Sequence, residues 1–586
     1  MVKVPKPEGF SRETAAPMLG WTKKGIGSPK QGAEAPPVSA DDAVSGFPRG
    51  LPDGDPHKPG AIGQWPSADT LAARLGQWRP GLFLLGRDHR GRYYGHDDDR
   101  HILTVAGSRA GKGVSLIVPN LLYWPGSVIA IDPKGELATL TASRRSADGS
   151  EWSLPMDPGH GRVFVLDPYG RVTGPAAQFR SAFNPLADLD PNTERGLDLA
   201  TQIADALIIQ SHGDGAHWTQ SARSFLRGLI LYVAASEPPA SRTLIRVREL
   251  VTQDEKAFAV MLQAMHDMGA RAGGLIARTA DTMNNKPPNE RMSVVSTCET
   301  HTAFLEGESM RSVLSGSDFR LEDLKTERVT VYLCLPATRL ATHGRWLRLF
   351  VSLAMEAMER TGPIAEGRSR VLFCLDEFAT LNRMESIEAA AGQIAGFGVK
   401  LWPVIQDLTQ LQRDYREAWE TFMGNAGLLT FFGNTDLTTT EHIAKRLGDA
   451  EVIRTVENLA ENWQQTAGQS RPDILSSLLG QGAGSDSTGA MTAGGRTQAQ
   501  QVVRGPLMNS SEVGTFFARD AGNLLGFIAR RDVPGFALYR CAYHSAEDDT
   551  LFGGLFDPVP GQKPPRTTAA QRAARDTGRL WHVPSP

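Results

Sequence analysis

The segment ILTVAGSRAGKGVSLIVPNL, residues 102–121, decides the fold of this 586-residue chain. Three of its first four residues are apolar, which is typical of a short buried strand. A turn with three glycines and a lysine follows, and apolar residues then recur at helical spacing. This order of strand, glycine-rich turn and helix is the layout of a phosphate-binding loop. In such a loop backbone N–H groups surround an anion, and the helix N-terminus adds partial positive charge.

The loop departs at two positions from the full motif G-x-x-x-x-G-K-[ST]. Ala106 stands in place of the first glycine, and Gly113 stands in place of the hydroxyl residue that contacts magnesium. Ser115 follows two residues later and could supply that hydroxyl, directly or through a water molecule. An ordinary glycine-rich turn would look similar, so the loop alone leaves both interpretations open. The residues predicted to surround the phosphates are Gly107, Ser108, Arg109, Ala110, Gly111, Lys112, Gly113 and Val114.

The composition excludes several classes of protein. A net charge of −3 is too balanced for a basic coat on nucleic acid, so any nucleic-acid contact must use a local patch or a pore. The four cysteines are scattered without a CxxC pair, which argues against a zinc site and a disulfide framework. The sequence contains no run of about 18 apolar residues and no apolar N-terminal signal. We therefore expect a cytoplasmic protein that is at most peripheral at the inner membrane.

Strand and helix patterns alternate along much of the chain, which predicts an α/β fold with a mainly parallel sheet. From residue 193 apolar residues recur at three- and four-residue spacing, which predicts an inserted all-α domain. Segments rich in Pro, Gly and Ser cannot bury enough apolar surface to fold. The predicted divisions are a disordered polar segment 1–78, a first nucleotide-binding part 79–192, the all-α domain 193–322, a second nucleotide-binding part 323–450, a flexible Gly/Ser-rich segment 451–505, closing C-terminal strands 506–560 and a tail 561–586.

A second motif, VLFCLDEF at residues 371–378, carries two acids at the end of an apolar strand. Because side chains alternate along a strand, Asp376 and Glu377 are expected to point in different directions. Beside a triphosphate, Asp376 would hold magnesium through its water shell and Glu377 would polarise the attacking water. Together with the loop, the acids predict an ATPase with ATP and Mg²⁺ as ligands. Gln406 ends the next strand candidate, where it either contacts the terminal phosphate or caps a helix.

Three further residues each leave two interpretations open. Asp132 and Asp167 both end a predicted strand, where a site role and capping of the following turn are equally plausible. Trp218 lies in a helical pattern. Helix packing is a plainer role for it than contact with a partner or ligand.

Several segments together resemble the TraG-type coupling proteins of type IV secretion and conjugation. They occur in the family order over roughly residues 80–450, with a weaker resemblance over 500–545. The segments are HILTVAGSRAGKGVSLIVPNLLYWPGSVIAIDPKGEL, FNPL, HWTQSARSFLRGLILYV, VLFCLDEFATL and FGVKLWPVIQDLTQL. The resemblance implies a RecA-like domain with an all-α insertion, in a hexameric ring ATPase that passes DNA or protein joined to DNA through a central channel. Expected partners are DNA or a relaxase–DNA complex, type IV secretion components and further copies of the chain.

The resemblance also implies roles for individual residues. By position in the family motifs, Lys112 is the phosphate lysine, Asp376 the magnesium acid, Glu377 the catalytic glutamate and Gln406 the sensor. Many members also have glycine in place of the last loop hydroxyl, and Ser115 stays a candidate magnesium ligand beside Asp376.

Two features depart from the family pattern. Members usually carry N-terminal transmembrane helices, whereas a polar segment stands in that place here, so membrane docking would depend on partners or on an absent anchor. A neighbouring subunit of a ring ATPase often supplies a charge-neutralising arginine. Arg345, Arg348 and Arg383 are candidates, although a solvated helix face is the plainer role for Arg345 and Arg348.

Two other functions stay open on the sequence. A nucleotide-gated scaffold would recruit secretion cargo through the helical insertion and the chain ends, with little turnover. A soluble DNA-translocating ATPase unrelated to secretion would use the same site. Hydrolysis that depends on DNA favours a motor over a scaffold.

Overall fold

The computed structural model describes residue 66 and residues 68–88, 90–146, 161–209, 216–390, 392–458, 497–529, 535–545 and 548–552. These residues belong to one compact unit, Gly50–Pro586. Most of the predicted disordered segment 1–78, the centre of the predicted flexible segment 451–505 and the predicted tail 561–586 lie outside the described residues.

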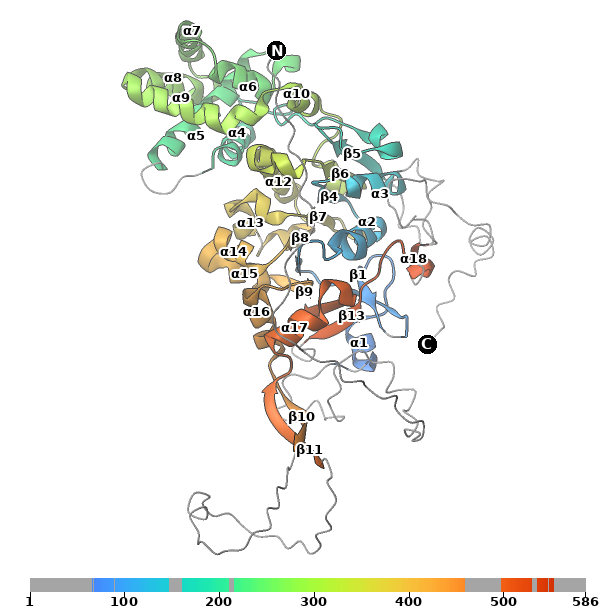
Figure 1. Ribbon diagram of the computed structural model, residues 1–586. Helices are drawn as coiled ribbons and strands as arrows, with labels where there is room; N and C mark the ends of the chain where they lie inside the picture. Colours follow the sequence, from blue (N-terminus) through green and yellow to red (C-terminus); the bar gives the residue numbers. More distant parts are fainter. Residues whose placement is uncertain are drawn as a thin grey trace, which may run out of the picture. The chain divides into compact units, whose positions relative to one another are not determined.

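An eleven-stranded sheet runs through this unit in the order β2-β1-β13-β12-β9-β3-β8-β7-β4-β6-β5 (Figure 1). Strands β3 to β9 pair with one another in parallel, which confirms the predicted α/β fold with a mainly parallel sheet. Strands β12, β13, β1 and β2 continue the sheet in antiparallel pairing. The strands are β1 Phe83–Arg87, β2 Tyr93–His96, β3 His101–Ala106, β4 Val128–Ile131, β5 Arg162–Leu166, β6 Val329–Leu333, β7 Val371–Leu375, β8 Val399–Ile405, β9 Ala426–Phe432, β12 Asn523–Ile528 and β13 Phe536–Tyr539.

The central strands are apolar throughout because helices flank the parallel sheet on two sides. Strands β4 (VIAI) and β7 (VLFCL) are buried at every position. Figure 1 shows α2 and α3 on one side of the strands and α12 to α16 on the other. The helices of this part are α1 Ala68–Leu75, α2 Val118–Tyr123, α3 Glu136–Arg145, α11 Asp323–Thr326, α12 Leu340–Arg360, α13 Glu385–Ala390, α14 Leu408–Tyr415, α15 Trp419–Gly424, α16 Leu437–Leu447, α17 Ser510–Phe516 and α18 Asp549–Phe552.

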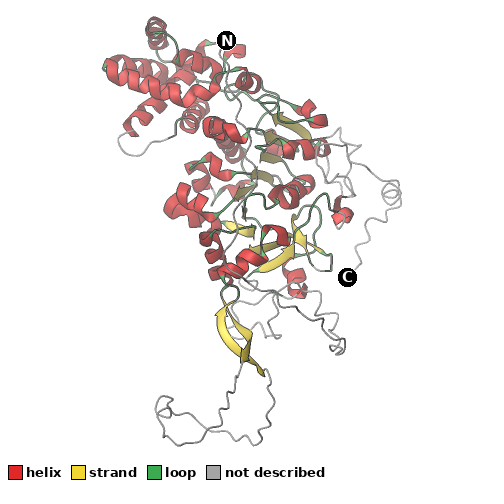
Figure 2. Ribbon diagram, viewed as in Figure 1, coloured by secondary structure: helices red, strands yellow, loops and turns green. Residues whose placement is uncertain are grey.

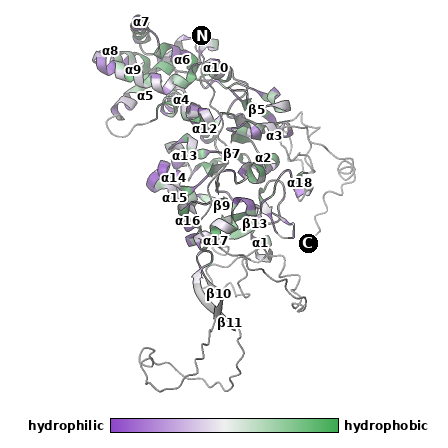
Figure 3. Cartoon of the chain, in the orientation of Figure 1, coloured by the Kyte–Doolittle hydropathy of each residue, from purple (hydrophilic) through white to green (hydrophobic). Residues whose placement is uncertain are grey.

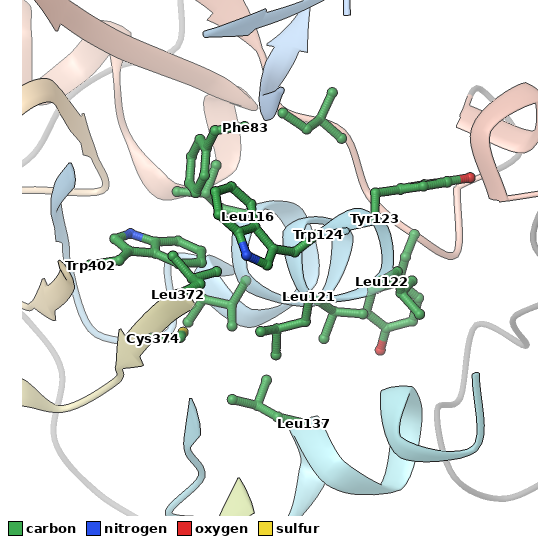
Figure 4. Packing of buried hydrophobic residues seen from close by; sticks show 14 of the residues in the cluster. Phe83, Leu116, Leu121, Leu122, Tyr123, Trp124, Leu137, Leu372, Cys374 and Trp402 are labelled. Carbon is green, nitrogen blue, oxygen red and sulfur yellow. The ribbon is translucent and has the colours of Figure 1, made fainter. Parts of the chain in front are cut away.

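A cluster of buried side chains joins α2 to the sheet (Figure 4). Leu121 of α2 and Leu372 of β7 belong to it, together with Phe83 and Trp402. The rings of Phe83 and Trp402 meet edge to face, with centroids 4.7 Å apart. The Trp402 indole N–H donates a hydrogen bond of 2.9 Å to the Thr104 hydroxyl on β3. The core therefore fixes both β3 and α2, the two elements that the glycine-rich turn connects.

Between β5 and β6 the described residues form helices without strands (Figure 2). Helix α4 packs against α12, and α5 contacts α4, α8 and α9. Figure 3 shows hydrophobic and hydrophilic residues on the same helices, as expected for amphipathic helices that pack on one face. The helices are α4 Glu194–Leu207, α5 Ala216–Ser236, α6 Leu244–Val251, α7 Glu255–His266, α8 Leu275–Asn285, α9 Pro288–Thr302 and α10 Glu308–Leu314. We propose to treat this segment as the all-α domain that the sequence predicts at 193–322.

The predicted flexible segment 451–505 has structure at both ends. Strands β10 (Asp449–Asn458) and β11 (Thr497–Pro506) pair in antiparallel register and form a separate two-stranded sheet. These ends form strands, for which the β-branched residues in EVIRTV are suited, and the flexibility of the segment stays a prediction. The Gly/Ser-rich centre lies outside the described residues.

The final predicted hairpin is present and joins the main sheet. Strand β12 pairs with both β13 and β9, and β13 also pairs with β1 through Arg87 and Tyr539. The turn around Asp532 lies outside the described residues. None of the described helices has the length and apolar character needed to cross a membrane.

Candidate functional site

The predicted site residues meet at one edge of the sheet. Strands β9, β3, β8 and β7 are consecutive neighbours and run parallel, so the residues after their carboxyl ends lie side by side. These residues are the glycine loop (residues 107–113) after β3, Asp376 and Glu377 after β7, Gln406 after β8, and Asn434 after β9. The sequence predicted all of them except Asn434.

Gly107 is required because two backbones approach closely at this point. Its N–H donates a hydrogen bond of 3.1 Å to the Phe432 carbonyl at the end of β9. A Cβ atom at Gly107 would lie 1.9 Å from the Gly433 carbonyl oxygen, and one at Gly433 would lie 2.4 Å from the Ala110 Cβ. Ala106, in contrast, is the buried last residue of β3. The loop therefore turns one residue later than the full motif would place its first glycine.

The rest of the glycine loop exposes donors suited to an anion. Arg109 and Gly111 have left-handed φ values of 56° and 87°, which close the turn, and Ser108 and Arg109 are exposed. Among the described residues, the backbone N–H groups of Gly111 and Lys112 donate to no other protein atom. A short helical turn, Gly113–Ile117, then leads into α2. Free N–H groups at a helix start are the donors that bind phosphate.

Lys112 joins the loop to both acids. Its Nζ lies 2.8 Å from Glu377 Oε1 and 3.1 Å from Asp376 Oδ1. Burial works against the charge of Lys112, but the two carboxylates outweigh burial and raise the pKa of Lys112 above its usual value. For Asp376, burial together with the charge of Glu377 raises the pKa, although Lys112 acts in the opposite direction. The two acids therefore stabilise the charge of Lys112, and Lys112 offsets part of the cost of burying the charge of Asp376.

The two acids converge on Lys112, whereas strand alternation predicted that they would diverge. The reason is the backbone of Glu377, which has left-handed angles of φ 53° and ψ 43°. The strand has ended at Leu375, so alternation no longer applies. Such a conformation is uncommon for a non-glycine residue and is typical of functional sites.

Gln406 lies against the second oxygen of Glu377. Its side-chain amide donates a hydrogen bond of 3.0 Å to Glu377 Oε2. Its main-chain carbonyl accepts a hydrogen bond of 3.1 Å from Asn434 Nδ2. In the sequence, Asn434 is marked only as the polar residue at the end of GLLTFFGN, after the apolar strand. Its place beside Gln406 depends on the position of β9 next to β3, which does not follow from chain order.

Three other predicted candidates make local contacts. The Ser115 hydroxyl donates to the Gly111 carbonyl at 2.9 Å. Asp132 accepts a hydrogen bond of 2.9 Å from the Ala138 N–H in the first turn of α3, and burial raises the pKa of Asp132 to about 7, with the charge of Asp376 adding to the effect. Asp167 accepts from the N–H groups of Arg171 and Val172, each at 2.8 Å. Both aspartates thus have the capping role that the sequence left open.

The arginine and tryptophan candidates lie apart from the loop. Arg348 is buried and donates to the carbonyl oxygens of Leu381 and Arg383, each at 2.7 Å. The prediction of a solvated helix face is therefore wrong for Arg348, because α12 packs on the segment that follows Glu377. Arg345 is half-buried.

Arg383 is exposed and pairs with Glu388 at 3.2 Å. Trp218 is half-buried and meets the ring of His217 edge to face, with centroids 5.2 Å apart.

Arg540 is a contact residue of the loop that the sequence did not reveal. It follows β13, and its guanidinium donates to the carbonyl oxygens of Ala110 and Arg519. The guanidinium also lies 4.9 Å from the centroid of the Phe432 ring, a cation–π distance. The Ala110 carbonyl and the Gly111 N–H belong to one planar trans peptide unit and therefore point in opposite directions. By binding the Ala110 carbonyl, Arg540 also fixes the direction of the Gly111 N–H. No local pattern marks Arg540, because 430 residues separate it from Ala110.

The arrangement suits a ligand with several phosphates and a divalent cation. Loop N–H groups and Lys112 supply donors and positive charge for phosphate oxygens, and the carboxylates of Asp376 and Glu377 are oxygen ligands of the kind that Mg²⁺ prefers. The Ser115 hydroxyl is the further oxygen within the loop helix. The carboxylate of Glu377, which faces the amide of Gln406, can accept a proton from water.

Comparison with known proteins identifies a family and a fold. The family model "Type IV secretory system Conjugative DNA transfer" matches residues 70–477. The conjugal transfer protein TraG of Escherichia coli is 26% identical over 409 residues, which are 66% of this chain and 61% of TraG. The protein VirD4 of Agrobacterium fabrum is 30% identical over 366 residues, which are 61% of this chain and 51% of VirD4. The chain therefore spans between half and two thirds of the length of these relatives.

Solved structures share the fold. The bacterial conjugative coupling protein TrwBdeltaN70 has a TM-score of 0.55 at 14% identity, over 85% of this chain and 93% of that chain. TrwB in complex with the non-hydrolysable ATP analogue ADPNP is similar, with a TM-score of 0.54 at 14% identity over 82% of this chain and 93% of that chain. So is TrwB with ADP and Mg²⁺, with a TM-score of 0.54 at 13% identity over 82% and 94%. The likeness confirms the RecA-like fold.

Proposed function

Because this chain belongs to the type IV secretory system conjugative DNA transfer family, we propose that it hydrolyses ATP to deliver DNA or nucleoprotein to a type IV secretion channel. The observation that carries this proposal is the contact of Lys112 with Asp376 and Glu377, beside Gln406. A phosphate lysine, a magnesium acid, a base for water and an amide near the terminal phosphate are parts that phosphoryl transfer needs. TrwB, which shares the fold, binds an ATP analogue and ADP with Mg²⁺, which supports ATP and Mg²⁺ as ligands here.

Each residue has a proposed task at the phosphates. The N–H groups of Gly111 and Lys112 hold phosphate oxygens, and Lys112 Nζ moves from the acids toward the outer phosphates. Asp376 would hold Mg²⁺, and Ser115 is the second candidate ligand. Mg²⁺, when bound, neutralises charge on the phosphates. Glu377 takes the proton of the attacking water, and Gln406, which contacts Glu377, responds to the terminal phosphate.

Assembly and partners belong to the same proposal. Family membership supports self-association, for which we propose a hexameric ring, and contact with DNA or a relaxase–DNA complex. Type IV secretion components are the proposed partners at the channel. The net charge of −3 places DNA contact on a local surface or in a pore rather than over the whole protein.

The test is ATP hydrolysis by the purified chain with and without single- or double-stranded DNA, at several salt concentrations. We expect DNA to stimulate hydrolysis and Lys112→Ala to abolish it. Lys134→Ala is the matched control, because the Lys134 side chain is 72% exposed and its ammonium pairs with Glu136 at 3.7 Å. Hydrolysis that is equal with and without DNA would contradict a DNA motor. Hydrolysis that survives Lys112→Ala would contradict the site itself. Particle mass with ATP, with and without DNA, tests the ring.

A further inference from the structure

A chain of hydrogen bonds links the ends of three strands to the glycine loop. Asn434 Nδ2 donates to the Gln406 carbonyl at 3.1 Å, and Gln406 Nε2 donates to Glu377 Oε2 at 3.0 Å. The other oxygen of Glu377 accepts from Lys112 at 2.8 Å. Asn434 follows β9, Gln406 follows β8 and Glu377 follows β7, so the chain passes across the end of β3. Only the Asn434 end of this chain has no role in the proposed hydrolysis.

Asn434 is held in place from several directions. The residue is 4% exposed. The residue before it, Gly433, contacts the glycine loop at Gly107 and accepts no side chain without a clash. The Gly433 N–H donates to the Phe517 carbonyl at 2.7 Å, and Asp436, two residues after Asn434, caps the N-terminus of helix α16. The position of Asn434 relative to Gln406 is therefore fixed by the fold rather than by the Asn434 side chain.

The orientation of the Asn434 amide follows from its partner. A carbonyl oxygen accepts hydrogen bonds and cannot donate, so the Asn434 nitrogen must face the Gln406 carbonyl. Its oxygen, Oδ1, is buried and accepts no hydrogen bond from the described residues. A buried acceptor without a partner is unfavourable, so packing alone gives no reason for an amide here.

We infer that Asn434 is a positioning residue for the hydrolysis proposed above, which holds the Gln406 main chain so that the Gln406 amide contacts Glu377. The inference rests on the proposed function. Gln406 has a second restraint, because its N–H donates to Gln410 Oε1 at 3.0 Å. Asn434 thus fixes the carbonyl and Gln410 fixes the N–H of the same residue. With both held, the main chain from which the Gln406 side chain reaches Glu377 keeps its position.

The test separates catalysis from binding with Asn434→Ala. We expect kcat for ATP hydrolysis to fall about three- to tenfold, the effect of one hydrogen bond. Binding of a non-hydrolysable ATP analogue should change less than twofold, because the glycine loop and Lys112 keep their contacts. On a Gln406→Ala background, Asn434→Ala should lower kcat less than twofold, since the residue acts through Gln406. A purely structural loss would reduce kcat equally on both backgrounds.

The matched control is Asn425→Ala, at the opposite end of β9, which should leave kcat unchanged. Asn434→Ser, a smaller polar replacement, serves as the second variant if Asn434→Ala does not fold. If the wild type hydrolyses ATP but Asn434→Ala has an unchanged kcat, the inference about Asn434 fails and the proposed function stands. The same conclusion follows if Asn434→Ala lowers kcat equally on the wild-type and Gln406→Ala backgrounds. Absence of hydrolysis in the wild type would overturn the proposed function and this inference with it.

Discussion

Replacing Glu377 by glutamine should tighten ATP binding and stop hydrolysis. Lys112 contacts two carboxylates, at 2.8 and 3.1 Å, and its contact with phosphates competes with both. Glu377→Gln removes the charge from the closer partner and keeps the size of the side chain. The Gln406 amide can turn so that its oxygen accepts from the new amide group. Lys112 is then held less tightly by the acids and is more available to phosphate.

The magnitude follows from the change in this one contact. An ion pair contributes about 1–1.5 kcal/mol more than a hydrogen bond to a neutral amide. The side chains of Lys112 and Glu377 are 15% and 27% exposed, so solvent screens the pair only in part. Because 1.4 kcal/mol corresponds to about a tenfold change in affinity, we expect ATP to bind about five- to tenfold more tightly. Hydrolysis should fall by about two to four orders of magnitude with the loss of the base.

The assay is calorimetric titration of wild type and Glu377→Gln with ATP and Mg²⁺, together with phosphate release. Glu388→Gln is the matched control, because Glu388 loses the same charge but pairs with the exposed Arg383. We expect the control to bind and hydrolyse ATP like the wild type. Equal or weaker binding by Glu377→Gln would refute the competition between acids and phosphates for Lys112. Retained hydrolysis would refute the proposed role of Glu377.

Variants at three further positions probe the loop and its surroundings. Gly107→Ala places a Cβ 1.9 Å from the Gly433 oxygen and should weaken ATP binding at least about tenfold. The control Gly424→Ala, whose Cβ meets open space, should leave ATP binding unchanged. Equal affinities of the two variants in a titration would contradict the close approach at Gly107. Arg540→Ala should weaken ATP binding about tenfold. Arg540→Lys should recover only part of the affinity, because one ammonium cannot replace the planar guanidinium that binds the Ala110 and Arg519 carbonyls together. Full recovery of the affinity by lysine would contradict this two-carbonyl contact. Burial raises the pKa of Asp132 from 3.8 to about 7. Between about pH 4 and 7 the folded chain therefore keeps this proton while the unfolded chain releases it. The free energy of unfolding consequently falls as the pH rises through that window. Asp132→Asn keeps an oxygen for the Ala138 N–H and should show a smaller fall in Tm between pH 5 and 7; an unchanged slope would show that Asp132 does not titrate there.

Local patterns were sufficient for much of the fold and the site. Buried parallel strands are apolar along their length, so segments such as VIAI and VLFCL stand out, and the polar residues that follow them mark the ends where ligands bind. Asp376, Glu377 and Gln406 were predicted in this way and Lys112 from the glycine loop, and the structure joins them: Lys112 contacts both acids, and Gln406 contacts Glu377. Their roles in catalysis stay predictions.

What the sequence could not supply depends on neighbours across the sheet. Asn434 reaches Gln406 because β9 lies beside β3, an order that the sequence of strands along the chain does not determine. The burial of Arg348 depends on where α12 packs, and helical spacing does not identify the segment that a helix covers. The left-handed turn at Glu377 is held by surrounding contacts rather than by its residue type.

The pairing of β13 with β1 has a consequence for the order in which the chain is made. The glycine loop leaves the ribosome early, but its Ala110 carbonyl meets Arg540 only after 430 further residues. At a synthesis rate of about 5–20 residues per second, that interval lasts roughly 20 to 90 seconds. Throughout that time β1 has an open edge where β13 will later pair, and β9, once it is made, has one until β12 pairs with it. We expect these edges to depend on chaperones during translation, and tight nucleotide binding to begin only in chains that have completed their last strands.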